Sequence, residues 1–117
     1  MNDPPNQSIG RAVTIIEELV ETDGLGVTEL ADRLDMPVST VHDHLRSLAE
    51  TGFLTKEGTE YTLTTKFLEV GHRQLQQSEI YAASHAELES LARETQEHVT
   101  LMVEEDLDGV LLAVIEG

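Results

Sequence analysis

Apolar residues near the start of the chain recur at intervals of three and four, which is the period of an α-helix. The positions of this stripe are Ile9, Ala12, Val13, Ile16, Leu19 and Val20. The pattern predicts an amphipathic helix that ends at the two glycines of "TDGLG" (22–26). Residues 1–7 contain two prolines and two asparagines and are predicted to form a flexible arm.

Two further helices are predicted before the first β-prone stretch. One begins near Thr28, whose hydroxyl can cap its N-terminus. Its inward positions are Leu30, Ala31 and Leu34. A turn over "DMP" (35–37) leads into the other, from Pro37 to Glu50, because proline suits the first turn of a helix. Gly52 is predicted to end this helix in a left-handed conformation.

The remainder of the chain predicts two hairpins separated by helices. "FLTK" and "EYTLT" are short β-prone runs joined through "EGT", where Gly58 can supply the turn. Thr64 or Thr65 is predicted to cap a fourth helix, whose apolar side carries Phe67, Leu68, Gly71 and Leu75. A polar helical linker, a fifth helix at about 80–96 and a second hairpin turned by Asp108 and Gly109 follow. The fifth helix carries Ile80, Leu88, Leu91 and Ala92.

These elements predict a mainly α fold with small β-hairpins. Helix, helix, turn, helix and hairpin, in that order, are typical of a winged helix-turn-helix. We therefore expect this domain over 8–72, the helical linker over 73–80 and the start of a further α/β domain over 81–117.

The third predicted helix divides into an apolar and a polar side at about 100° per residue. The side expected to be buried carries Val38, Val41, Leu45 and Leu48. The opposite side carries Ser39, Asp43, Arg46, Ser47 and Glu50, with Thr40 and His42 on its flanks. Short hydroxyl side chains let a helix approach the major groove of DNA, and an arginine can bind guanine O6 and N7. The competing interpretation is a solvated face of an ordinary core helix.

The net charge of the chain argues against binding to DNA. The chain has 23 acidic and 7 basic side chains, a formal net charge of −16, and the excess is spread over its whole length. Acid-rich, lysine-poor chains resemble proteins of salt-accumulating microbes, where molar salt shortens the screening length to about 3 Å. The alternative is an ordinary acidic protein that binds no nucleic acid. The apolar share of 39% is sufficient for a folded core.

Several classes of site and location are excluded or disfavoured by the sequence. The chain has no cysteine, which excludes disulfides and thiolate metal sites. Its five histidines match no metal-ligand spacing, and no phosphate loop, nucleophile motif or catalytic carboxylate pair occurs. The longest apolar run, 110–115, is too short for a membrane span, and the N-terminus lacks a signal-peptide pattern. We therefore expect a cytoplasmic protein that is not an enzyme and has no cofactor or metal.

Three stretches carry a family resemblance. "IGRAVTIIEELVE", "GVTELADRLDMPVSTVHDHLRSLAETGFLTKEGTEYTLTTKFLEVG" and "LARETQEHVTLMVEEDLDGVLLAVIEG" resemble IclR-type transcription regulators, most specifically at "STVH", "GFL" and "FLEVG". The resemblance implies a winged helix-turn-helix, a linker helix and the first helix and hairpin of an effector-binding domain. It also implies sequence-specific binding of a palindromic operator in double-stranded DNA by a homodimer or a higher homo-oligomer. A small-molecule effector is expected only with a complete C-terminal domain.

The resemblance and the helix pattern together predict the contacts. The predicted DNA-binding residues are Thr28, Ser39, Thr40, His42, Asp43, Arg46, Ser47 and Lys56. Further cations that can line this face are Arg33, Arg11 and Lys66, and the resemblance implies dimer contacts at residues such as Ile9, Val13, Phe67, Val70 and Leu75.

Asp43 departs from the family pattern, which often has arginine directly after "STVH". Three roles are open for it: binding a cytosine amine, holding Arg46 through an i, i+3 pair, or lying at the edge of the contact with no role. Together with the net charge, Asp43 also supports a competing function, a winged-helix module that binds proteins or mimics nucleic acid.

Overall fold

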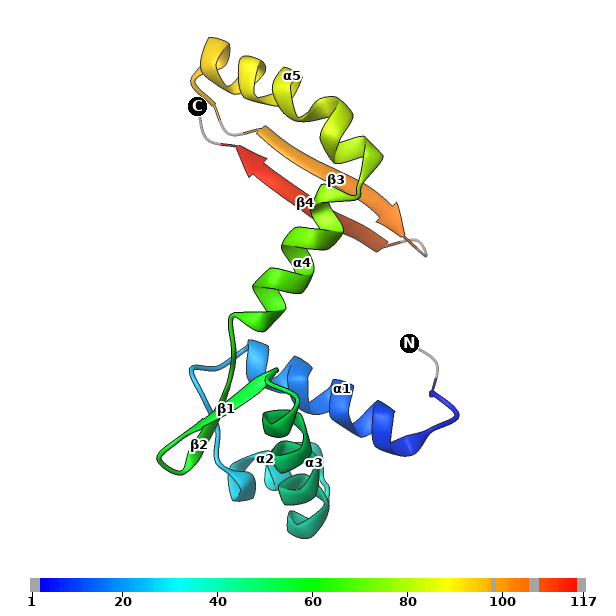
Figure 1. Ribbon diagram of the computed structural model, residues 1–117, viewed down its shortest axis with the longest axis vertical. Coiled ribbons are helices and arrows are strands. Elements are labelled where there is room, and N and C mark those ends of the chain that lie inside the picture. Colours follow the sequence, from blue (N-terminus) through cyan, green and yellow to red (C-terminus); the bar gives the residue numbers. More distant parts are fainter. Residues whose placement is uncertain (1–2, 98, 106–107, 116–117) are drawn as a thin grey trace. The chain divides into compact units, whose positions relative to one another are not determined.

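The computed structural model describes residues 3–97, 99–105 and 108–115 (Figure 1). The chain divides into two compact units, Met1–Leu68 and Glu69–Gly117. Its elements are α1 (Gln7–Val20), α2 (Val27–Leu34), α3 (Val38–Glu50), β1 (Leu54–Glu57), β2 (Glu60–Leu63), α4 (Lys66–Gln76), α5 (Glu79–Thr95), β3 (Val99–Glu105) and β4 (Asp108–Ile115). Helix α4 crosses the boundary between the two units, and its first three residues belong to the first.

Helix α1 begins inside the stretch predicted to be a flexible arm. The side chain of Asn6 caps it by accepting hydrogen bonds from the backbone N–H groups of Ser8 (3.0 Å) and Ile9 (3.3 Å). Pro4 also lies against the helix, because a Cβ added at Gly10 would be 2.7 Å from the Pro4 Cγ. Because Gly10 has no side chain, Pro4 can pack directly against the helix.

The predicted apolar face of α1 is only partly buried. Ile15, which lay outside that face, is fully buried, as is Leu19 at 2% exposure. By contrast, Ile9 is 61% exposed, Val20 62% and Val13 40%. The helix carries more apolar residues than one face can bury, and its packing on α2 and α3 selects the Ile15 side. The remaining apolar residues form a separate exposed stripe.

The start of α2 also differs from the prediction. Gly26, not Thr28, is the N-cap, and no side chain caps the helix; Thr28 is the second helical residue and is exposed. The cause lies just upstream, where Leu25 pairs with Tyr61 through two backbone hydrogen bonds of 2.8 and 3.2 Å. This pairing holds the chain extended up to Gly26, so that the helix starts directly after it. Asp35 ends α2 in the left-handed conformation (φ 53°), which confirms the predicted turn.

Helix α3 has the predicted extent and the predicted buried positions at its centre. Val41 and Leu45 are fully buried, and Leu48 packs against the core. Val38 is 52% exposed, so its predicted burial is wrong; it is the first helical residue of α3. Gly52 follows the helix with a φ of 87°, which confirms its predicted left-handed conformation.

Strands β1 and β2 form the predicted antiparallel hairpin, with Leu54 opposite Leu63 and Glu57 opposite Glu60. Gly58 supplies the turn with a φ of 64°. Leu25 adds a short third segment beside β2, which the sequence pattern did not predict. Gly24 permits this close approach: its φ is 137°, and a Cβ there would be 2.9 Å from the Thr62 side chain.

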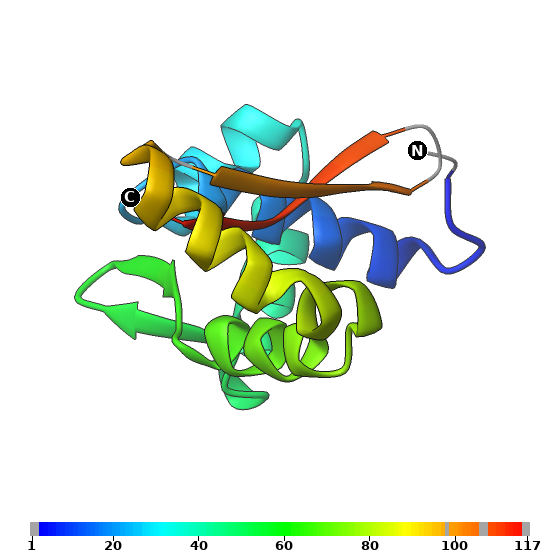
Figure 2. The ribbon, with the colours of Figure 1, turned by 90° about the horizontal axis from the view of Figure 1, so that it is seen from above.

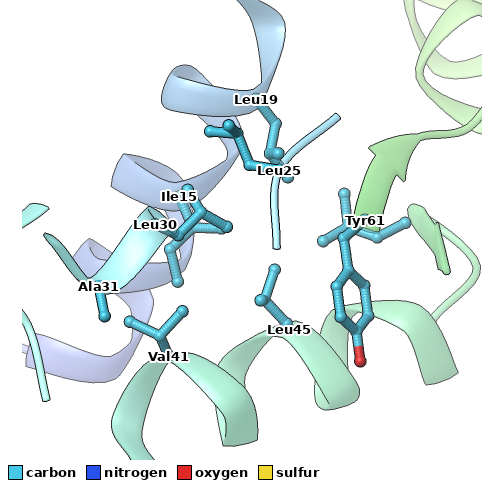
Figure 3. Packing of buried hydrophobic residues seen from close by; sticks show 9 residues of the cluster. Ile15, Leu19, Leu25, Leu30, Ala31, Val41, Leu45 and Tyr61 are labelled. Carbon is cyan, nitrogen blue, oxygen red and sulfur yellow. The ribbon is translucent and has the colours of Figure 1, made fainter. Parts of the chain in front are cut away.

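One hydrophobic core holds the first unit together (Figure 3). Its buried members are Ile15, Leu19, Leu25, Leu30, Ala31, Val41, Leu45, Leu54 and Tyr61. Val41 and Leu45 project from α3 toward side chains of α1 and α2, and Tyr61 brings the hairpin against α3 (Figure 3). Burial of the inner face of α3 leaves its polar face directed outward.

The predicted helical linker at 73–80 is interrupted. Thr64 caps α4, because its hydroxyl accepts the backbone N–H of Lys66 (3.3 Å), and the helix ends at Gln76. Ser78 then caps α5 by accepting the backbone N–H of Tyr81 (3.2 Å). A serine side chain that caps a new helix competes with continuation of the old one, so two helices form instead of one.

In the second unit, α5 runs along the antiparallel β3–β4 hairpin (Figures 1 and 2). Ala92 of α5 is buried, whereas Ile80 is 55% and Leu91 48% exposed, so α5 buries only part of its apolar residues. Asp108 and Gly109 do not form the turn: they begin β4, opposite Glu105 and Glu104. Residues 106–107 between the strands lie outside the described residues. None of the described helices combines the length and the apolar character that a membrane span needs.

Candidate nucleic-acid interface

The outer face of α3 presents most of the predicted DNA-binding residues. Ser39, His42, Asp43, Arg46 and Ser47 are all exposed. Thr40 is half-buried, and its carbonyl oxygen lies 2.7 Å from His44 Nδ1, which therefore carries the proton. The face consists of short polar side chains around one long arginine, as insertion into a major groove requires.

A cleft of about 370 Å³ joins this helix to α2 and to the hairpin. Three predicted site residues from three elements line it: Thr28 of α2, His42 of α3 and Lys56 of β1. Its other lining residues are Gly26, Val27, Glu29, Thr59 and Tyr61. The fold thus brings together a hydroxyl, an imidazole and an ammonium group that lie far apart in the sequence.

The electrostatics of this cleft are mixed. The N-terminus of α2 opens onto it without a side-chain cap, so that the positive end of the helix dipole is available to an anion. Lys56 adds a full positive charge; its Nζ lies 5.9 Å from the centre of the Tyr61 ring, directly across the hairpin. Glu29 also lines the cleft, and its negative charge opposes the positive charge of Lys56 and of the helix N-terminus. A phosphate oxygen can accept hydrogen bonds here from backbone, hydroxyl and ammonium groups.

Asp43 lies at the side of the outer α3 face that borders α1. Together with Ser47 it lines a groove of about 320 Å³ that also includes Ile9 and Ala12 of α1. Its carboxylate is 3.7 Å from His42 Nδ1 and 83% exposed. Within the described residues no ion pair joins Asp43 to Arg46, so the proposed i, i+3 pair finds no support in the geometry.

The other predicted cations differ in their availability. Arg33 forms an ion pair with Glu18 of α1 at 3.3 Å. Lys66 donates a hydrogen bond to the carbonyl oxygen of Thr51 at 2.7 Å. Arg46 and Lys56, in contrast, are exposed and take part in no ion pair among the residues that the structure describes. These two are therefore the cations best placed to reach an anionic partner.

Sequence reasoning missed the residues that complete the cleft, because Glu29, Thr59 and Tyr61 carry no motif. The available signal was Gly26, directly before the helical pattern of "VTEL". It allows the close approach of the hairpin, since a Cβ there would be 3.2 Å from the Thr59 carbonyl oxygen. In the described part of the chain, potential metal ligands nowhere gather in groups of three or more.

Comparisons with known proteins agree with this geometry. Residues 8–58 match the family model of the IclR helix-turn-helix domain. The HTH-type transcriptional regulator KdgR of Escherichia coli is 32% identical over 96 residues, which are 80% of this chain and 36% of KdgR. The protein ArcR of Halobacterium salinarum is 28% identical over 100 residues, which are 85% of this chain and 38% of ArcR.

Solved structures share the fold. The IclR crystal structure from Thermotoga maritima superimposes with a TM-score of 0.77 at 26% identity, covering 95% of this chain and 46% of that one. An IclR family transcriptional regulator from Brucella abortus gives 0.80 at 21% identity, covering 100% and 47%. These likenesses confirm the predicted winged helix-turn-helix. The chain spans between a third and a half of the length of the four proteins named here.

Proposed function

We propose that this chain is a transcription regulator that binds double-stranded DNA in a sequence-specific manner, because residues 8–58 match the family model of the IclR helix-turn-helix domain. The observation that carries the proposal is the cleft shared by Thr28, His42 and Lys56 beside the exposed face of α3. In this arrangement α3 enters the major groove, while the hairpin and the start of α2 bind the phosphate backbone. The curated relatives named above carry the names of HTH-type transcriptional regulators, which supports this proposal.

The net charge of −16 is compatible with this function if the protein works in high salt. Repulsion between exposed charges and DNA falls as the screening length shrinks to about 3 Å at 1 M salt. Binding then depends more on hydrogen bonds and shape than on counterion release. We propose a salt-rich cytoplasm as its setting, which the likeness to the Halobacterium protein supports. A mobility-shift assay in molar potassium chloride separates this function from the competing one, a module that mimics nucleic acid and binds no operator.

The exposed stripe on α1 favours a homodimer on a palindromic operator. Ile9, Val13 and Val20 lie on one side of the helix at 40% exposure or more, and Val70 of α4 is 51% exposed. Phe67, another predicted dimer residue, packs instead against the core. One recognition helix contacts only a few base pairs, so useful specificity needs two half-sites. A small-molecule effector belongs to this proposal only together with a complete effector domain.

Arg46→Ala is expected to weaken binding to the best operator by about 1–3 kcal/mol, because one good bidentate contact to guanine contributes that much. The operator is first obtained by selection from randomised duplexes in molar salt, and affinities are then measured by fluorescence anisotropy. Arg73→Ala is the matched control, since it removes the same charge from an exposed arginine of the second unit. Equal affinity of Arg46→Ala and the unchanged protein for the operator would remove Arg46 from the base-reading residues.

Asp43→Asn is expected to strengthen binding to operator and random DNA by the same factor, about two- to fivefold at low salt, and to leave base preference unchanged. The physical reason is that Asp43 lies beside α1 and His42, so that its charge acts only through repulsion of phosphate. Glu17→Gln on α1 is a control for the loss of one exposed negative charge. A changed preference at a single base pair would show instead that Asp43 reads a base.

A further inference from the structure

The C-terminal end of α3 lacks a cation of its own. Its last turn contains no basic residue and ends on Glu50, whose charge is unfavourable beside the negative end of the helix dipole. The last carbonyl groups of a helix also lack partners within the helix. Here Thr51 satisfies one of them locally, with its hydroxyl donating to the Leu48 carbonyl oxygen at 2.6 Å.

Lys66, the first residue of α4, supplies the missing cation. Its ammonium group donates a hydrogen bond to the Thr51 carbonyl oxygen at 2.7 Å. The same nitrogen lies 4.7 Å from the centre of the Phe53 ring, within the range of a cation–π interaction. One side chain thus binds both the end of α3 and the residue that leads into the hairpin.

Two neighbours of Lys66 reinforce the same connection. Thr64 donates from its hydroxyl to the Gly52 carbonyl oxygen (2.6 Å) and from its backbone N–H to the Phe53 carbonyl oxygen (3.0 Å). Phe67 packs edge-on against Phe53, with ring centres 4.8 Å apart and planes at 60°. We call these five residues, Thr51, Phe53, Thr64, Lys66 and Phe67, the α3–α4 junction.

We propose that Lys66 is a positioning residue for the recognition helix and does not bind DNA phosphate. It holds the C-terminal turn of α3 against the first turn of α4, and thereby fixes the direction in which Arg46 and Ser47 point. The part of the proposal that concerns DNA rests on the function proposed above. The junction itself does not, because its contacts exist within the free chain.

The test compares Lys66→Met with Lys56→Met in the full chain. Lys56 and Lys66 are the only two lysines, so that both variants lose the same charge and keep a flexible stem. For Lys66→Met we expect operator affinity to fall about three- to tenfold, with affinity for random DNA and the salt dependence unchanged. Lys56→Met should instead weaken both DNAs alike and lower the salt slope by about 1. Lys66→Arg should retain operator affinity, because arginine can make the same two contacts.

Amide hydrogen exchange of the free protein tests the junction even if no DNA binds. In Lys66→Met we expect faster exchange at Thr51, Gly52 and Thr64, with the amides of α1 unchanged. Unchanged exchange at the junction would overturn the proposal, as would a salt slope lowered by about 1 or an unaltered operator affinity. Failure of the unchanged protein to bind any duplex would reject the proposed function alone. Amide hydrogen exchange in Lys66→Met would then still show whether Lys66 stabilises the α3–α4 junction.

Discussion

Replacing Leu45 with alanine is expected to lower the free energy of unfolding of the first unit by about 2–5 kcal/mol. The Leu45 side chain is fully buried: its relative exposure is 0%, and it packs in the core shared by α1, α2 and the hairpin. Truncation removes three carbon atoms from this contact and leaves a cavity that the surrounding helices can only partly fill. Urea denaturation followed by circular dichroism, together with hydrogen exchange of the α3 amides, measures the loss.

Ser47→Ala is the matched control for this prediction. It lies two residues further along the same helix on the exposed side, and its effect on stability should stay within about 0.5 kcal/mol. A Leu45→Ala variant as stable as Ser47→Ala would mean that α3 does not pack through this side. Because one helix both completes the core and carries the proposed DNA-binding face, a large loss at Leu45 should abolish DNA binding as well.

The division of α3 into two faces could be predicted because the helix period separates its residues cleanly. Val41 and Leu45 are four residues apart and meet the core, while Ser39, Asp43 and Arg46 fall on the other side. Gly52 and Gly58 could be predicted for a related reason, since a left-handed backbone conformation favours glycine. The helix period and the conformational preference of glycine were therefore sufficient to predict these features.

Other features depend on contacts between distant segments, and the sequence pattern does not contain them. The pairing of Leu25 with Tyr61 moved the start of α2 to Val27, so that Thr28 is a cleft residue and not a cap. The role of Lys66 likewise depends on the approach of α4 to the end of α3. In α1, periodicity predicted one apolar face, whereas packing divides the apolar residues into a buried side and an exposed side.

This exposed side of α1 leads to a second prediction with a large expected effect, here on DNA binding without loss of the fold. Val13→Glu should convert a dimer to a monomer, because it introduces a charge into the stripe of Ile9, Val13 and Val20 that we propose as a dimer contact. Linking two half-site contacts in one dimer raises affinity by about 10²–10⁴ over a single one. The variant should lose this factor on a two-half-site operator and bind an isolated half-site as before. Sedimentation velocity at tens of micromolar and anisotropy on both duplexes, in molar salt, measure the two effects.

Gln7→Glu is the control for Val13→Glu, because it adds the same negative charge to α1 outside the stripe. Gln7 is exposed on the same helix, six residues before Val13 and therefore about 120° around the axis, away from the stripe. It should leave both the sedimentation coefficient and operator affinity unchanged. Since Val13 is 40% exposed within the first unit, the Val13→Glu chain should still fold, and its circular dichroism should match that of the unchanged protein. A Val13→Glu variant that remains dimeric and keeps full operator affinity would exclude α1 from the dimer contact, and the two half-sites would then have to be joined through another surface.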